Sequence, residues 1–451
     1  MIDYIQFLTT KALKPKMKPV PFSGQFNGAL FPHQRDCVEM VLNVGTGALF
    51  CETGTGKTIM QLEWARHIPG DVIVAAPLAV ANQTIREGKR HLNMEIGYSK
   101  DGTVNERVTI TNYERLHLFD LSRFTGVILD ESSILKSFSG KVKQFLCDSF
   151  SETPYKLACT ATPAPNDYME LGNHSEFLGI MPGTEMLSRW FINDPSKVGS
   201  YRLKGHAVKP FWSWVASWAA CMSKPSDLGY SDDGYDLPPL RTHTHQVETQ
   251  TRTAFDDGLL FDMPEMNATN LHRKKRESVD DRVRLVADMV NDDTDPWLVW
   301  CESNQESEML TKAIPDAVDV KGAHDADTKE ERLIGFVDGK YRVLVTKSSI
   351  AGFGLNLQHC RKQVFASISY SYEKFYQAVR RSWRFGQTQP VDIHVVVADA
   401  EIPVWRAIEK KALAHDQMKE HMKYAVFSKG QESQVKIDYN PTYQAKLPEW
   451  L

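Results

Sequence analysis

The stretch "LFCETGTGKTIM" at 49–60 combines glycines, a lysine and a threonine at the spacing of a phosphate-binding loop. In such a loop, successive backbone N–H groups and the N-terminus of the following helix cradle phosphate oxygens. Gly54 and Gly56 permit the close approach of backbone to phosphate. Lys57 would reach the terminal phosphates of a nucleotide, and Thr58 would bind magnesium. The expected ligands are therefore ATP and Mg²⁺.

A pair of adjacent carboxylates supports this interpretation. In "VILDESS" (127–133) an apolar run ends in Asp130 and Glu131. The end of a strand would bring Asp130 to the magnesium ion and Glu131 to the water that attacks the γ-phosphate. Each pattern alone is ambiguous, because Cys51 stands where phosphate loops usually have glycine and because an acidic helix cap would explain the carboxylates. The occurrence of both patterns in one chain favours a nucleotide site.

The elements that must position these residues are short apolar runs separated by helix-sized segments. Such runs predict parallel strands in a sheet that helices cover on both faces. In the first half the runs are "GALF" (47–50), "DVIVAAP" (71–77), "RVTIT" (107–111), "GVILDE" (126–131) and "YKLACT" (155–160). In the second half they are "PWLVWC" (296–301), "AVDVKG" (317–322), "YRVLVT" (341–346), "QVFAS" (363–367) and "VDIHVVVA" (391–398). We therefore predict an α/β protein built from two similar halves.

The sequence between the two halves is aromatic and rich in turn residues. Phe211, Trp214 and Trp218 recur at helical spacing, which predicts a packing helix that braces the two halves. The basic segment 197–209, which contains Tyr201, would suit a hairpin that separates strands or grips DNA. The predicted segments are an N-terminal extension (1–27), an ATP-binding first lobe (28–172), an insert with a linker (173–275), a second lobe (276–430) and a C-terminal tail (431–451).

The composition excludes several classes of protein. Lys and Arg number 53 against 57 Asp and Glu, so bulk positive charge does not coat a nucleic acid and any such contact must be local. The seven cysteines include no C-x-x-C pair, which disfavours a zinc ribbon or a disulfide framework and favours a reducing compartment. The apolar run 72–81 is shorter than the roughly 20 residues that span a bilayer. We expect a cytoplasmic protein with no membrane segment.

The second half contains the most specific pattern, "YQAVRRSWRFGQTQP" (376–390). Gln377, Arg381 and Arg384 are spaced by four and three residues, which would place them on one face of a helix. The pattern resembles Q-x-x-x-R-x-x-R-x-G-Q-x-x-P of superfamily-two helicase motors, and more narrowly of Swi/Snf-type ATPases. The resemblance covers about residues 28–400 and implies two RecA-like lobes with ATP and Mg²⁺ bound between them. It also implies that both arginines act as fingers on the γ-phosphate.

The same resemblance implies roles for further residues. The segment "LFPHQ" (30–34) resembles the family's adenine-recognising motif, so Gln34 would read the adenine edge. The implied nucleotide contacts are Gln34, Thr53, Gly54, Thr55, Gly56, Lys57, Thr58, Gly354 and Gln377, with Thr58 and Asp130 on the metal. The implied nucleic-acid and coupling residues are Pro77, Asn112, Thr160, Thr162, Ser348 and Asn356. Thr160 and Thr162 belong to "CTATPAPN" (159–166), which resembles the family's T-G-T-P-x-x-N motif.

Some positions depart from the family pattern. Arg380 stands where the family usually has glycine, and Trp383 where a histidine or small residue is common. Cys51 is not such a departure, because the family's phosphate loop often starts with an acidic or small residue. Ala161 replaces a glycine, and "DESS" replaces the commoner D-E-A-H, so a relay from Ser133 toward the coupling motif is expected to differ. These changes leave the expectation of ATP hydrolysis in place and concern its coupling to movement.

The functional expectation is an ATP-dependent DNA translocase or helicase that binds duplex or branched DNA regardless of sequence. Branch migration, fork remodelling and limited unwinding in replication, recombination or repair are the expected tasks. One alternative is the motor subunit of a restriction or DNA-processing complex. Another is an inactive motor that serves as a DNA-binding scaffold. The sequence does not indicate an oligomeric state, and a monomer is compatible with it.

Overall fold

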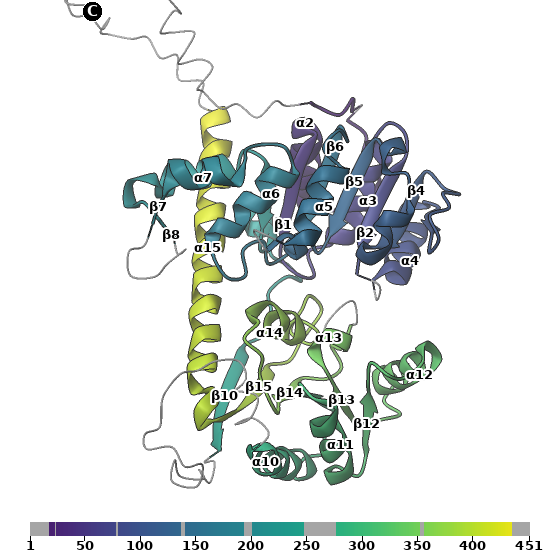
Figure 1. Cartoon of the computed structure of the whole chain (residues 1–451), viewed down its shortest axis with the longest axis vertical. Coiled ribbons are helices and arrows are strands. Elements are labelled where there is room, and N and C mark those ends of the chain that lie inside the picture. Colours follow the sequence, from purple (N-terminus) through teal and green to yellow (C-terminus); the bar gives the residue numbers. More distant parts are fainter. Residues whose placement is uncertain are drawn as a thin grey trace, which may run out of the picture.

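Each buried apolar run forms a strand, and the strands assemble into two separate parallel sheets (Figure 1). A computed structural model of the 451-residue chain describes residues 18–22, 24–77, 80–136, 140–193, 201–247, 277–351 and 356–434. Neighbouring strands are parallel throughout both larger sheets. The protein thus has two RecA-like lobes, each with a parallel sheet flanked by helices, and the predicted fold class is confirmed.

The first lobe contains a seven-stranded sheet in the order β3-β4-β2-β5-β6-β1-β9. Its strands are β1 (Thr46–Cys51), β2 (Val72–Ala76), β3 (Gly97–Tyr98), β4 (Val108–Asn112), β5 (Gly126–Asp130), β6 (Tyr155–Cys159) and β9 (Ala219–Met222). Side chains along β1 alternate between the two faces. Ala48 and Phe50 join one hydrophobic cluster, whereas Leu49 and Cys51 join the other. The sheet therefore has a core on each face.

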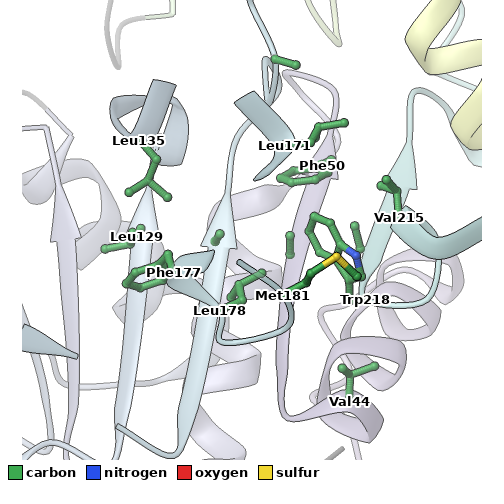
Figure 2. Packing of buried hydrophobic residues seen from close by; sticks show 14 of the residues in the cluster. Val44, Phe50, Leu129, Leu135, Leu171, Phe177, Leu178, Met181, Val215 and Trp218 are labelled. Carbon is green, nitrogen blue, oxygen red and sulfur yellow. The ribbon is translucent and has the colours of Figure 1, made fainter. Parts of the chain in front are cut away.

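Helices cover both faces of this sheet. Helices α2 (Pro32–Val44), α3 (Lys57–His67) and α4 (Ala81–Leu92) supply one core. Helices α5 (Lys141–Ser149), α6 (Leu171–Phe177), α7 (Gly183–Trp190) and α8 (Val208–Val215) supply the other. Figure 2 shows part of this second core, in which Trp218 meets Phe50 edge to face with ring centroids 5.8 Å apart. The aromatic residues of the insert thus complete the first lobe.

The second lobe contains a six-stranded sheet in the order β10-β15-β14-β11-β13-β12. Its strands are β10 (Leu240–Val247), β11 (Trp297–Trp300), β12 (Ala317–Val320), β13 (Val343–Thr346), β14 (Lys362–Phe365) and β15 (Val391–Ala398). Its helices are α10 (Val279–Asn291), α11 (Asn304–Ala313), α12 (Ala326–Val337), α13 (Ser348–Ala351) and α14 (Tyr372–Val379). Two hydrophobic clusters again lie on opposite faces of the sheet.

The segment 173–275, set apart in the sequence as an insert and linker, contributes a strand to each sheet. Strand β9 pairs with β1 in the first lobe, and β10 pairs with β15 in the second. Strands β7 (Phe191–Asn193) and β8 (Tyr201–Leu203) form a small antiparallel hairpin. The part of the basic segment before Tyr201 lies outside the described residues. Strand pairing therefore joins this segment to both lobes.

A single helix links the lobes at the C-terminal end of the described chain. Helix α15 (Ile402–Gln434) has 33 residues and runs along both lobes (Figure 1). Near its start Val404 packs in the second lobe, while Met418 and Met422 lie in a core of the first lobe. No helix of the described residues is long and apolar enough to cross a membrane.

Candidate active site

The phosphate loop connects β1 to α3. Gly54 and Gly56 have φ values of +89° and +88°, in the left-handed region that favours glycine. Gly56 is the N-cap of α3, so the first N–H groups of this helix face the loop. The Lys57 ammonium donates to the carbonyl oxygens of Cys51 at 2.9 Å and of Glu52 at 3.1 Å. The loop thus has the backbone shape and the cation that phosphate binding requires.

Gln34 is part of this loop structure. Its side-chain Nε2 donates to the carbonyl oxygen of Thr55 at 2.9 Å, and its Oε1 accepts from the Phe31 N–H at 3.0 Å. A Cβ added at Gly56 would collide with the Gln34 amide. Close packing is thus a second reason, besides the positive φ, why this position requires glycine. The Cys51 side chain is fully buried in the core of the lobe, and its Sγ lies 3.9 Å from the Ala220 carbonyl oxygen. The Cys51 side chain therefore packs in the core, and only the backbone of this residue faces the phosphate-binding loop.

The two predicted carboxylates lie at the end of β5, the strand two places from β1 in the sheet. Asp130 is the last residue of the strand and is 7% exposed. Glu131 has a φ of +56°, an unfavourable conformation for a residue with a side chain. Burial raises the pKa of Asp130, and the Lys57 charge opposes this rise. Burial also raises the pKa of Glu131, to about 7, against the opposing charges of Lys57 and Arg381.

The second-lobe arginines do not lie on a helix, contrary to the prediction from their spacing. Helix α14 ends at Val379, and Arg381 and Arg384 occupy the turns that follow. The Arg381 Nε donates to the Gln377 carbonyl oxygen at 3.1 Å, and its own carbonyl oxygen accepts from the Leu357 N–H at 3.0 Å.

Charges from both lobes meet in the space between them. Burial lowers the pKa of Arg381 to about 10, with a further lowering by Arg384 and an opposing effect of Glu131. Burial lowers the pKa of Arg384 as well, against the charge of Glu87 on α4. A Cβ added at Gly54 would come within 3.0 Å of the Phe385 side chain, so the arginine-bearing turn abuts the phosphate loop. Lys57, Asp130 and Arg381 therefore lie close enough to Glu131 for their charges to shift its pKa, whereas the charge that acts on Arg384 from the first lobe is that of Glu87.

Gln377 has buried polar atoms that the protein does not satisfy. The residue is 3% exposed, and neither Nε2 nor Oε1 of its amide has a hydrogen-bond partner among the described residues. A buried amide without partners is costly, and such groups often mark a site where a ligand supplies the missing bonds. This position agrees with a nucleotide contact from the second lobe.

The predicted coupling motif contacts Glu131. The Thr160 Oγ1 donates to Glu131 Oε2 at 3.3 Å and accepts from the Thr162 N–H at 3.0 Å. The Thr162 side chain is buried, and its Oγ1 has no partner within the described part of the chain. Both threonines therefore lie next to the carboxylate expected to activate water.

The hydroxyl of Ser133 points elsewhere. It donates to Glu373 Oε1 on α14 at 2.5 Å, and the Lys136 ammonium pairs with the second oxygen of the same carboxylate at 2.5 Å. A relay from Ser133 toward the coupling motif is therefore absent among these contacts, and the serine instead joins the lobes. Ser132 is paired with His174 Nε2 at 3.1 Å.

The other predicted contacts lie at strand ends and in loops. Pro77 follows β2, and Asn112 ends β4 and donates its Nδ2 to Glu114 Oε2 at 2.9 Å. Ser348 begins α13 and is 7% exposed, whereas Asn356 is exposed. Gly354 lies outside the described residues. No hydrogen bond among the described residues joins these positions to the nucleotide loop.

The second lobe matches a known family model. Residues 281–386 match the helicase conserved C-terminal domain. This match indicates a superfamily-two helicase-type fold and a nucleic-acid motor of the helicase or translocase type that uses ATP. No curated protein matches the chain.

A magnesium ion would fit the first-lobe residues. Among the described residues no group of three or more His, Cys, Asp and Glu side chains is arranged to hold a metal. Magnesium at nucleotide sites needs no such cage, because one or two protein oxygens and the phosphates complete its shell. The Asp130 carboxylate and the Thr58 hydroxyl, which has no partner among the described residues, supply oxygens of this kind.

Sequence reasoning missed one part of this site. The Glu52 carboxylate in the phosphate loop is buried and pairs with Arg380 and with Lys419. The carboxylate is visible in the sequence, but its partners follow more than 300 residues later. The unexpected arginine at position 380 was the available signal.

Proposed function

We propose that this protein is an ATP-dependent motor that moves along DNA, preferably duplex or branched DNA, as a Swi/Snf-type ATPase. The observation that carries the proposal is the meeting of Lys57 and Glu131 from the first lobe with Arg381 from the second. These charges are close enough to shift the pKa of Glu131 in opposition to burial. A site divided between two lobes allows hydrolysis to open and close the space between them.

In the proposed mechanism each residue has a distinct task. Gln34 and the loop backbone orient the nucleotide, while Lys57 holds its terminal phosphates. Asp130 and Thr58 would hold magnesium, which neutralises phosphate charge when bound. Glu131 accepts the proton of the attacking water. Its raised pKa, about 7, suits a base that works near neutral pH.

The arginines complete the site from the other side. Arg381 and Arg384 stabilise the negative charge that spreads over the transferred phosphoryl group. Because they belong to the second lobe, hydrolysis requires that the lobes be together. Thr160, bonded to Glu131, provides the proposed connection from the nucleotide to the DNA track.

A groove next to the coupling motif supports a contact with DNA. The groove has a volume of about 530 Å³ and is lined by Tyr201 and Arg202 of β8, Lys410 and Lys411 of α15, and Asn166. Neither Arg202 nor Lys410 has an ion-pair partner among the described residues. Unpaired cations beside a tyrosine suit phosphates and a stacked base. We therefore propose that strand β8 of the β7–β8 hairpin forms one wall of a DNA-binding groove.

The cysteines support a cytoplasmic location. All seven are free, and six of them are buried. Unpaired thiols are typical of a reducing compartment.

The decisive test is ATPase activity with different DNA structures. The purified protein is assayed with duplex, single-stranded, forked and four-way-junction DNA at one salt concentration, together with strand-movement assays. We expect DNA to stimulate hydrolysis, duplex or branched DNA to stimulate it most, and Lys57→Ala and Glu131→Gln to abolish it. Stimulation should weaken as salt rises, because phosphate contacts release counterions.

Each alternative gives a different result. An inactive scaffold would bind DNA without turnover under every condition. A motor subunit of a restriction or DNA-processing complex would copurify with a nuclease or a methyltransferase. Stronger stimulation by single strands than by duplexes would contradict the proposed track.

A further inference from the structure

The Glu52 carboxylate is the centre of a buried cluster that draws on three parts of the chain. Within the loop it accepts the Thr53 N–H at 2.8 Å and the Thr53 hydroxyl at 3.1 Å. From the second lobe, Arg380 pairs with it at 2.8 Å, and the Tyr376 hydroxyl donates to it. From α15, the Lys419 ammonium pairs with it at 2.6 Å. One carboxylate thus joins the phosphate loop, the second lobe and the C-terminal helix.

This cluster remains charged despite its burial. Glu52 is 7% exposed and Arg380 is 5% exposed. Burial alone would raise the pKa of Glu52, but the charges of Arg380 and Lys419 outweigh it and hold the pKa well below its usual range. Buried ion pairs are a poor source of net stability, because desolvation offsets the attraction, and they are better suited to fixing one geometry. A contribution to stability therefore does not explain the presence of this cluster.

The contacts around Arg380 hold its guanidinium in one position. Its guanidinium lies over the Trp383 ring, 4.4 Å from the centroid, and its Nη1 donates to the Trp383 carbonyl oxygen at 3.2 Å. The Trp383 Nε1 donates to the Pro238 carbonyl oxygen at 2.7 Å. Arg380 and Trp383 are the two residues in this motif that depart from the family pattern. In this chain the two side chains stack on each other, and the Arg380 guanidinium pairs with Glu52 of the phosphate loop.

The neighbour of Arg380 in the chain is Arg381, the proposed finger. Both residues follow the end of α14: Arg380 pairs with Glu52 at 2.8 Å, and Arg381 is near enough to Glu131 for their charges to interact. Fixing the first therefore fixes the backbone that carries the second. Among the described residues Arg380 contacts Glu52, Tyr376 and Trp383. These contacts would let it influence hydrolysis by setting the position of Arg381.

We infer that Glu52 and Arg380 form a latch between the lobes that positions Arg381 for hydrolysis, with Lys419 linking α15 to the same carboxylate. Glu52 and Arg380 are positioning residues. This inference rests on the proposed function, since it specifies how the arginine of that site is placed. It also predicts that the lobes separate more readily when the latch is removed, whether or not ATP is hydrolysed.

The kinetic test is a double-mutant cycle in the full-length protein with Glu52→Gln, Arg380→Met and the double variant. Each single change should lower kcat roughly ten- to hundred-fold, the usual effect of a misplaced catalytic group, while the KM for ATP changes less than kcat. Because Arg380 is expected to act through its pair with Glu52, the double variant should be no slower than the slower single variant. Arg380→Lys, which keeps the charge, should recover part of the loss.

Two further measurements keep the test decisive. Small-angle X-ray scattering of the protein without nucleotide should give a larger radius of gyration for Arg380→Met than for the wild type. Arg361→Met, which removes an arginine of the same lobe paired with Asp295 at 2.6 Å, should change neither scattering nor kcat. Multiplicative kinetic effects or unchanged scattering in Arg380→Met would overturn the latch. Absence of ATPase activity in the wild type would refute the proposed function instead, and scattering would still test the latch.

Discussion

Replacing Arg381 with alanine tests whether the second lobe takes part in hydrolysis. The side chain is 7% exposed, its Nε is held by the Gln377 carbonyl oxygen, and its charge acts on Glu131. An alanine at this position removes the guanidinium but leaves the phosphate loop and both carboxylates in place. ATP binding should therefore survive while hydrolysis is lost.

The expected loss has two parts. Arginine fingers contribute about 10³- to 10⁵-fold to kcat, which corresponds to ~4–7 kcal/mol at about 1.36 kcal/mol per tenfold. The Arg381 charge also lowers the pKa of Glu131, which stands at about 7, so its removal raises that pKa and leaves less carboxylate at neutral pH. Raising the pH restores the carboxylate but not the finger. The defect should accordingly be largest near pH 6 and smaller, though still present, near pH 9.

The assay is steady-state ATPase activity in the presence of DNA across this pH range, with ATP affinity measured separately by competition with a fluorescent analogue. Arg361→Ala is the matched control, because this arginine is 39% exposed and pairs with Asp295 on the surface. Surface pairs contribute about 0–1 kcal/mol, so its kcat should stay close to that of the wild type. A folded Arg381→Ala protein with kcat within tenfold of the wild type would refute the finger. So would a loss of ATP affinity without a loss of kcat.

Three further outcomes are expected. The kcat/KM for ATP should rise between pH 6 and pH 8 with a midpoint near the Glu131 pKa of about 7, since the acid form cannot accept a proton. A flat profile in the wild type would exclude this carboxyl as the base. Trp218→Ala should lower the free energy of unfolding by about 3–5 kcal/mol in urea titrations, because the side chain is fully buried against Phe50; a change below 1 kcal/mol would contradict this packing. Thr160→Val should retain DNA binding but lose strand movement relative to hydrolysis, and equal losses of both would argue against a coupling role.

Much of the fold follows from local patterns in the sequence. The strand predicted at 47–50 is β1, Thr46–Cys51, and the strand predicted at 391–398 is β15 with the same ends. Fully buried parallel strands must be apolar along their whole length, which makes them visible. Strand β10 escapes this rule because it is an edge strand whose residues are largely exposed, such as His243 and Thr244. Its pairing partner, β15, follows it by about 150 residues and gives no local signal.

Site residues that belong to short local motifs were also predictable, whereas those brought together by tertiary packing were not. Lys57, Asp130 and Glu131 were predicted because each lies at the end of a strand or the start of a helix, where short motifs determine the geometry. The helical face assigned to Arg381 and Arg384 was wrong, because periodicity does not show where α14 ends. The Glu52 cluster was missed because its members are brought together only by the packing of two lobes and α15.

Helix α15 has a consequence for how the protein is made. Met418 and Met422 fill a core that also contains Val44, so parts of one lobe are separated by the entire second lobe in the sequence. Domains emerging from the ribosome usually fold in order from the N-terminus. Here the first lobe cannot finish its core until helix α15 has been translated. Until then its unfilled apolar surface is exposed to chaperones and proteases, and premature termination near residue 400 would leave neither lobe in its finished form.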